Sequence, residues 1–236
     1  MIKVNKSLYV FLILSMFSLG AFSQLKFGIK VGVNNTFPSY KINTEGIVKP
    51  KTSGFGTVYG FFLDLPISET FIFQSELLTD FRYYTAHTLI EANSTNFSSK
   101  TEDFGYNKLA YFEIPLLFKF NTRLKTSSSY GSDNYFGIYA GPLIGIKLSE
   151  SYEGSRTSTV TSFDQKTVST NEIENYSVDF KPLDVSISAG AMLDFERGLR
   201  LEIRYIRSVS KANTDTDFGI SYNLLQFSFG YNFIKG

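Results

Sequence analysis

"YFEIPLLFKF", residues 111–120, decides the fold, because its side chains separate into two classes by position. Successive side chains of a β-strand point to opposite faces of the sheet. One face is wholly apolar and consists of Phe112, Ile114, Leu116, Phe118 and Phe120. The other is mostly polar and consists of Tyr111, Glu113, Pro115, Leu117 and Lys119. The stretch therefore predicts a strand between two different environments, with a bulge or local break at Pro115, which lacks an N–H donor.

The same alternation recurs in seven other stretches of the chain. They are residues 25–34, 54–65, 71–84, 135–149, 184–195, 199–206 and 224–233. Each is close to the length that crosses a bilayer as a tilted strand, and no apolar stripe of helical period competes with them. The pattern predicts an all-β fold, an eight-stranded antiparallel up-and-down transmembrane β-barrel.

Composition excludes several classes of function. Charged residues make up 19% of the 236 residues, below the roughly 25% that is usual for soluble domains. The net charge of +1 leaves no basic surface for nucleic acid, so we expect no such partner. The chain has no cysteine, which excludes disulfides and thiolate metal sites.

The first residues of the chain have the pattern of a secretory signal peptide. Lys3 and Lys6 precede an apolar run, and Ala21 and Ser23 offer small residues for cleavage before Gln24. A transmembrane anchor is the alternative, but the apolar run is shorter than the roughly 20 residues of a membrane helix. We expect residues 1–23 to be a signal peptide and residues 24–236 to be an outer-membrane β-barrel domain.

The connections between the expected strands alternate in length. Residues 66–69 and 196–198 are tight turns, whereas four links are long and polar: 35–51, 86–107, 149–181 and 208–219. Long loops at one end and short turns at the other are typical of outer-membrane barrels. The connection at 121–134 is the exception, because it is long at the end where the others are short.

The polar face distinguishes a membrane barrel from a soluble, lipocalin-like carrier, whose apolar face would point inward. It is rich in glycine, which suits a narrow lumen, and it carries seven basic and six acidic side chains. Such near balance favours an internal ion-pair network, since a selective pore would show an excess of one sign. The residues that we expect to form this structural network are Glu76, Asp80, Arg82, Glu113, Lys119, Arg200, Glu202 and Arg204.

Residues for catalysis or metal binding are sparse. His87 is the only histidine, and we expect it in an external loop just past the third strand. A serine–histidine pair needs a positioned histidine, and zinc needs several His or Cys ligands. The sequence therefore predicts no catalytic residue, no cofactor, no metal and no enzyme.

Three stretches resemble the PorT-like outer-membrane barrel domain that is common in Bacteroidetes. They are "FGIKVGVN" after the signal peptide, "FQSELL" in the third expected strand and "YFEIPLLFKF" in the fourth, with aromatic "GYNF" near the C-terminus. The resemblance spans the mature chain and implies an eight-stranded outer-membrane barrel without a general assigned activity. A few members are similar to secretion-system accessory proteins.

Taken together, the residues predict an outer-membrane protein with both termini in the periplasm and a packed polar lumen. Its role would be structural or interactive, with lipid as one partner and envelope or secretion-system proteins reached through the external loops, chiefly 149–181. The alternatives are a narrow, porin-like solute pore, then a lipid-modifying membrane enzyme or a soluble lipocalin-like carrier.

The assignment of faces can be tested by substitution with arginine. Arg in place of Ile114 or Ile187 should lower the free energy of unfolding by roughly 2–4 kcal/mol, if these side chains face lipid near the midplane. Arg at Gly190, on the opposite face, should fail for a different reason, because it crowds the lumen. Refolding titrations in lipid measure the change in the free energy of unfolding. If the barrel tolerates Arg at both isoleucines, the assignment of lipid-facing and lumen-facing sides would be reversed.

Overall fold

The computed structural model describes residues 25–42, 47–48, 53–94, 97–124, 134–162, 165–174, 180–213 and 218–233. These residues form strands β1 (Lys26–Ile42), β2 (Ile47–Val48), β3 (Gly54–Pro66), β4 (Phe71–Ser94), β5 (Phe97–Leu124), β6 (Asn134–Ser162), β7 (Gln165–Glu174), β8 (Leu183–Asp194), β9 (Leu199–Ser208) and β10 (Phe218–Asn232). The expected signal peptide lies outside the described residues. Within these ranges, no helix is long and apolar enough to cross a membrane.

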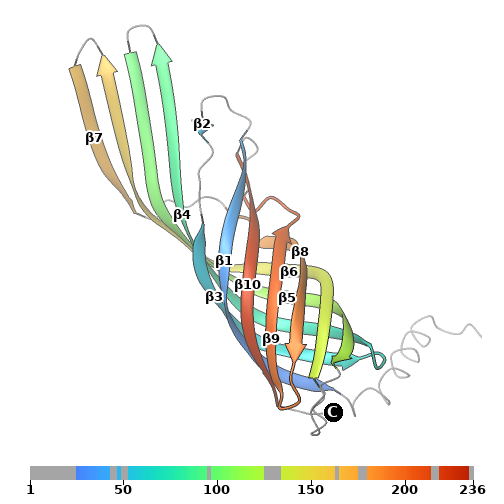
Figure 1. Ribbon diagram of the computed structural model, residues 1–236. Helices are drawn as coiled ribbons and strands as arrows, with labels where there is room; N and C mark the ends of the chain where they lie inside the picture. Colours follow the sequence, from blue (N-terminus) through green and yellow to red (C-terminus); the bar gives the residue numbers. More distant parts are fainter. Residues whose placement is uncertain are drawn as a thin grey trace, which may run out of the picture.

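Eight of the strands form a closed antiparallel ring (Figure 1). Around the ring the order is β1, β3, β4, β5, β6, β8, β9 and β10. The ring closes where β1 pairs with β10, from Gly28 opposite Asn232 to Ile42 opposite Phe218. Strands β2 and β7 are additions, because β2 pairs with β4 and β7 with β6. The predicted eight-stranded antiparallel barrel is confirmed.

The two faces of the ring differ as the alternation predicts. Apolar side chains point outward and are exposed, for example Val31 at 59%, Phe118 at 63% and Phe229 at 60%. Charged side chains point inward and are buried, and Arg82 and Arg204 are both 0% exposed. The barrel is therefore inverted relative to a soluble carrier, whose apolar side chains would fill the interior.

Both predicted tight turns are present at one end of the ring, here called the turn end. Between β3 and β4, the Ile67 N–H donates to the Phe71 carbonyl at 2.9 Å. Between β8 and β9, the Gly198 N–H donates to the Phe195 carbonyl at 2.9 Å, and Gly198 has a φ of 90°. This backbone conformation favours glycine, so Gly198 allows the sharp reversal. β1 also begins and β10 ends at the turn end.

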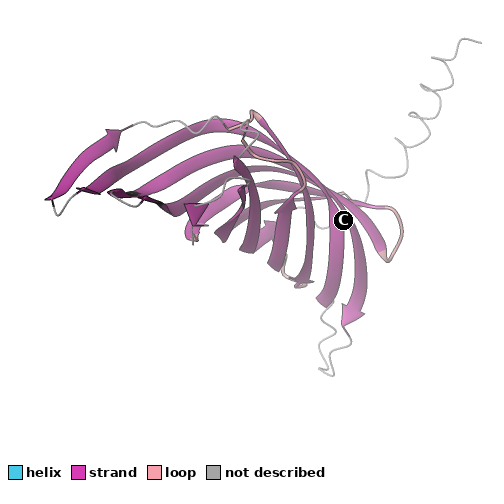
Figure 2. Ribbon diagram, turned by 90° about the horizontal axis from the view of Figure 1, so that it is seen from above, coloured by secondary structure: helices cyan, strands magenta, loops and turns pink. Residues whose placement is uncertain are grey.

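Three of the four long links contain strands, which corrects the expectation that they are loops. The link 35–51 holds the end of β1 and all of β2, and the links 86–107 and 149–181 hold longer strand segments. Residues 85–94 of β4, 97–107 of β5, 149–162 of β6 and 165–174 of β7 continue past the ring as one antiparallel sheet, here called the outer sheet. It projects at the upper left of Figure 1, and its strands extend furthest to the left in Figure 2. His87 consequently lies in β4, opposite Phe104 of β5. Both faces of these segments are largely polar, so they lack the apolar alternation that reveals the ring strands.

A tyrosine packs on two glycines where the ring passes into the outer sheet. Gly105 of β5 and Gly154 of β6 are directly opposite each other. The Tyr152 side chain is buried and occupies the space that a Cβ atom would need at either glycine. An aromatic ring that covers strand glycines restores contacts that the missing side chains cannot make. This contact supports the root of the outer sheet.

The predicted break at Pro115 is present on the β4 side. Pairing of β4 with β5 stops after Ser75 and Leu116 and resumes, in the same register, at Leu78 and Glu113. The β-bulge lies elsewhere, between Ala110 and Tyr111, where the register against β6 shifts by one residue. Pro115 thus interrupts a ladder without changing its register, as expected for a residue that cannot donate.

Two inward-facing glycines should respond differently to alanine. At Gly60 of β3 a Cβ atom would clash with the main chain at Leu77 and Leu78, whereas at Gly145 of β6 the nearest atom, in Tyr111, is 3.4 Å away. We expect Gly60→Ala to lower the free energy of unfolding by about 1–3 kcal/mol, because a main chain cannot move aside cheaply. Gly145→Ala should change it by less than about 0.5 kcal/mol. Urea titrations of the refolded variants measure both, and equal costs would contradict this account of the narrow wall.

Candidate functional site

Twelve charged side chains are buried in the lumen among the described residues. Five are basic and seven are acidic: Lys30, Arg82, Lys119, Arg200 and Arg204, with Asp64, Glu76, Asp80, Glu113, Asp184, Asp194 and Glu202. All eight residues of the expected network are in this set. The count of seven basic and six acidic side chains changes, because Lys26 and Lys147 are not buried and Asp184 joins the set.

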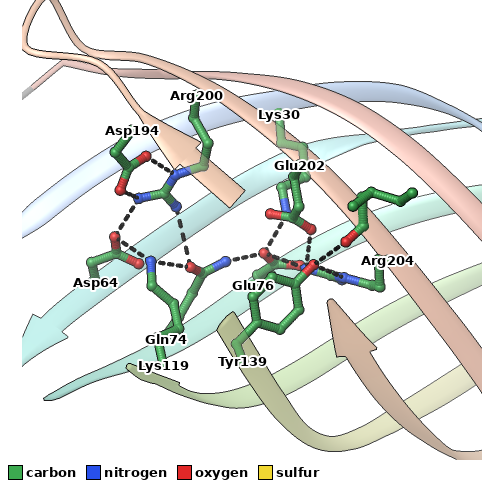
Figure 3. Close-up of polar contacts among 11 residues, drawn as sticks. Lys30, Asp64, Gln74, Glu76, Lys119, Tyr139, Asp194, Arg200, Glu202 and Arg204 are labelled. Carbon is green, nitrogen blue, oxygen red and sulfur yellow. Dashed lines mark hydrogen bonds and ion pairs between the residues drawn. The ribbon is translucent and has the colours of Figure 1, made fainter. Parts of the chain in front are cut away.

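The first group of ion pairs lies nearest the turn end and is called the turn-end group. Arg200 of β9 contacts Asp194 of β8 at 2.5 Å and Asp64 of β3 at 2.6 Å. Lys119 of β5 contacts the same oxygen of Asp64 at 2.9 Å. The Arg200 guanidinium also stacks over the Phe62 ring, 4.3 Å from its centroid. Two cations and two carboxylates therefore balance, as Figure 3 shows.

The second group, the middle group, joins opposite walls of the barrel. Arg204 of β9 contacts Glu76 of β4 at 2.8 Å and Glu202 at 2.7 Å. Lys30 of β1 contacts the same two carboxylates at 2.5 and 2.7 Å. β4 and β9 are four positions apart in a ring of eight, so the contact between Arg204 and Glu76 crosses the lumen. The Arg204 Nε also donates to the Tyr139 hydroxyl at 3.2 Å.

Gln74 connects these two groups into one network (Figure 3). Its carbonyl oxygen accepts hydrogen bonds from Lys119 at 2.7 Å and from Arg200 at 3.1 Å. Its amide nitrogen donates to Glu76. A single uncharged side chain thus bridges two ion-pair groups, and connected polar networks of this kind help to rigidify an interior. Sequence reasoning missed Gln74, although it lies on the inward face with Glu76.

The third group, the outer group, lies toward the opposite end and has an excess of carboxylates. Arg82 of β4 contacts Asp80 at 2.7 Å, Asp184 of β8 at 3.5 Å, and Glu113 of the neighbouring strand β5. The Arg82 guanidinium also stacks over the Tyr111 ring, 4.3 Å from its centroid. Hydroxyl groups complete the surroundings, since Ser186 donates to Asp184 at 3.2 Å. One cation therefore holds three carboxyl groups together.

An apolar cluster fills the lumen above the outer group, so the lumen is not polar throughout as predicted. This cluster, here called the outer cap, consists of Tyr84, Leu109, Tyr111, Leu143, Phe180, Ile206, Ala212, Ile220, Tyr222 and Leu224. Phe180 and Ala212 come from the connections beyond β7 and β9. The Lys181 N–H donates to the Ala212 carbonyl at 2.7 Å, and Lys147 donates to the Phe180 carbonyl at 2.7 Å. These hydrogen bonds hold the two connections over the lumen, at the end of the barrel opposite the turn end.

Side chains fill the lumen, and the arrangement offers no metal centre in the described part of the chain. From the turn end to the opposite mouth of the barrel, the lumen contains the turn-end group, the middle group, the outer group and then the outer cap. No cluster of three or more His, Cys, Asp or Glu side chains among the described residues could hold a metal ion. The carboxylates are instead committed to arginine and lysine. These ion pairs and apolar contacts connect the walls of the barrel through its interior.

Comparison with known proteins agrees with the architecture. A family model for the "Outer membrane protein beta-barrel domain" matches residues 18–213. A comparison with curated proteins found no match. Among solved structures, Neisserial surface protein A is 10% identical over 88% of this chain and 97% of its own, with a TM-score of 0.36. The attachment invasion locus protein of Yersinia pestis is 13% identical over 88% and 99%, with a TM-score of 0.26.

A third solved structure is similar to the same extent. The outer membrane protein OprG from Pseudomonas aeruginosa is 11% identical over 89% of this chain and 96% of its own, with a TM-score of 0.32. The family match, by contrast, covers most of the chain and supports an outer-membrane location.

Removal of Arg200 should destabilise the barrel, because two buried carboxylates in the lumen would lose their arginine partner. Arg200→Met leaves Asp64 and Asp194 without their shared guanidinium, and we expect a loss of about 3–5 kcal/mol in the free energy of unfolding, because buried charges would lose their partner. Arg207→Met, on the same strand but exposed, is the matched control and should cost less than about 0.5 kcal/mol. Urea titration in detergent compares them; similar midpoints would show that the turn-end group does not support the fold.

Proposed function

The chain belongs to the outer-membrane protein β-barrel domain family, and from this premise we propose that it is a non-enzymatic, non-conducting barrel that presents its outer sheet to a protein partner. It lies in the outer membrane, where short turns face the periplasm and longer segments face outside. In this orientation both termini of the barrel are periplasmic and the outer sheet is extracellular.

The observation that carries the proposal is the contact across the barrel between β4 and β9. Glu76 and Arg204 meet at 2.8 Å although their strands stand opposite each other, so their side chains bridge the lumen. An eight-stranded barrel has an interior just wide enough for side chains to fill. With the outer cap above this contact, solute passage would require several ion pairs to break. This arrangement favours closure over the porin-like alternative.

The outer sheet supports an interaction role, because it is ordered and has an open edge. Among the described residues β7 pairs only with β6, so its other side presents main-chain groups without a strand partner. Exposed edges of this kind accept an added strand, with main-chain hydrogen bonds supplying affinity. The partner surface that we propose is thus a sheet edge, in place of the external loop 149–181 that the sequence suggested. We propose an extended segment of an envelope or extracellular protein as the partner.

We also propose that the chain belongs to the narrower PorT-like group that its sequence resembles. The matching family model describes outer-membrane barrels in general. A secretion-system partner would follow from the PorT-like resemblance, and it would need a contact surface of the kind that β7 offers. A periplasmic contact through the turn end is the competing arrangement.

Planar-bilayer recordings test closure directly. We expect wild-type protein to give no reproducible single-channel steps, with flotation of proteoliposomes showing that it is inserted. The double variant Glu76→Ala, Arg204→Ala empties the lumen centre and serves as the comparison. Regular single-channel steps from the wild-type protein would contradict this proposal and favour the porin-like pore.

Photo-crosslinking in cells tests the partner surface. A photoreactive amino acid at Thr167 or Ser169, both exposed on β7, should capture a defined protein. The same probe at Glu69, exposed in the turn between β3 and β4, is the control and should not capture it. Capture of a protein from Glu69 alone would instead place the interaction at the periplasmic turn end and contradict a contact through β7.

A further inference from the structure

The outer wall of the barrel has an apolar hollow of about 420 Å³ across four strands. Its outward-facing lining consists of Phe136 of β6, Ala191 and Leu193 of β8, Leu201 and Ile203 of β9, and Phe227 and Phe229 of β10. Met192, Glu202 and Ser228 also border it, but their side chains are buried on the lumen side, so their main chain forms the floor. Ala191 is the smallest of the outward-facing residues that line it.

The hollow lies in the half of the barrel near the turn end. Leu193 is opposite Leu201, directly before the turn that joins β8 and β9. Ala191 is three residues from the end of β8, or about 10 Å at roughly 3.3 Å per residue. One leaflet contributes about half of a hydrocarbon core that is ~30 Å thick. The hollow is therefore at the depth of the acyl chains of the periplasmic leaflet.

Its chemistry and size restrict what can occupy it. The outward side chains that line it are all apolar, so a headgroup or a charged peptide would lose its hydrogen bonds there. Seven side chains are also far fewer than the roughly 20–30 residues that each partner contributes to a stable protein interface. The hollow is continuous with the apolar surface that faces lipid. A hydrocarbon chain fits these constraints, and a second protein surface does not.

Two charged side chains lie in the turn that follows Leu193 of the hollow along β8. Glu196 and Arg197 are adjacent, both exposed, in the turn between β8 and β9. Their opposite charges match a zwitterionic headgroup, with the phosphate near Arg197 and the ammonium near Glu196. We propose that this hollow and turn form a site for one phospholipid of the phosphoethanolamine class from the periplasmic leaflet. One acyl chain lies in the hollow and the headgroup lies at the turn.

Native mass spectrometry of the full chain, released from detergent with added dioleoyl phosphatidylethanolamine, tests the site. Wild type should retain one lipid per chain after the remaining lipid is stripped. Ala191→Phe fills the hollow and should weaken retention by about tenfold or more, a difference that the adduct ratio resolves. Ala191→Leu is a milder second variant, should the larger side chain impair refolding, and should weaken retention in the same direction.

Leu77→Phe is the matched control, because Leu77 is 49% exposed on β4, across the ring from β9. It enlarges the lipid-facing surface without touching the hollow, and its lipid retention should equal that of wild type. Equal retention by wild type, both Ala191 variants and the control would overturn the site, since the bound lipid would then be ordinary annular lipid. A retained second copy of the chain, lost in Ala191→Phe, would overturn the choice of lipid as occupant.

The headgroup is tested separately. Wild type should retain phosphatidylethanolamine in preference to phosphatidylglycerol, and Arg197→Gln should reduce retention of the former several-fold while Ala191 stays intact. A preference for phosphatidylglycerol would overturn the zwitterionic assignment. Co-purification of a lipid A species at the hollow would overturn the assignment to the periplasmic leaflet.

Discussion

Hydrogen bonding of the main chain in a solvent without water is the constraint on which the rest of this structure depends. In hydrocarbon, each unpaired N–H or C=O group costs several kcal/mol, so a sheet can cross a membrane only if it has no edge. The pairing of β1 with β10 removes that edge. Once the ring is closed at eight strands, its interior can hold little more than side chains, and the residues that point inward must fill it and satisfy one another.

The lumen meets this requirement by combining very small and very large residues. Glycines such as Gly60 bring the walls together, while Arg82, Arg200 and Arg204 extend from opposite strands to carboxylates and aromatic rings. Arginine suits this role because its planar guanidinium can hold two carboxylates and stack on a ring at once. The same choice of residues removes the room that a solute would need. Stability of the fold and closure of the barrel therefore have a common cause.

Much of the ring was predictable because its two faces meet different surroundings. The alternation in residues 111–120 reflects a strand with lipid on one face and the lumen on the other, and all eight ring strands show the same alternation. The segments of the outer sheet are largely polar on both faces, so a stretch such as "SRTSTVTS" (155–162) shows no contrast from which a strand could be inferred. Its strands are defined by pairing instead. β4 with β5 and β6 with β7 pair as hairpins, and β5 with β6 pairs between segments about 50 residues apart, such as Phe104 with Ser155.

The network was predictable as a set of residues but not as a set of contacts. Parity places Glu76, Arg200 and Arg204 inside the barrel, yet which of them meet depends on the stagger between strands on opposite walls. Gln74 shows the limit, since an uncharged side chain gives no sign in the sequence that it joins two ion-pair groups. The outer cap was missed for a related reason. Phe180 comes from outside any strand, and nothing in the local sequence indicates that it closes the mouth.

The length of β5 has a mechanical consequence. Its 28 residues would extend roughly 95 Å at ~3.4 Å per residue, whereas a tilted crossing of the bilayer uses about 9–11 residues. Barrel and outer sheet are thus parts of the same strand, without a hinge of loop residues between them. A pull on the tip of the outer sheet loads the hydrogen bonds between β5 and β6 in shear, where many must break together. The ring therefore anchors the outer sheet through continuous strands, and a force on the sheet is transmitted directly to the barrel wall.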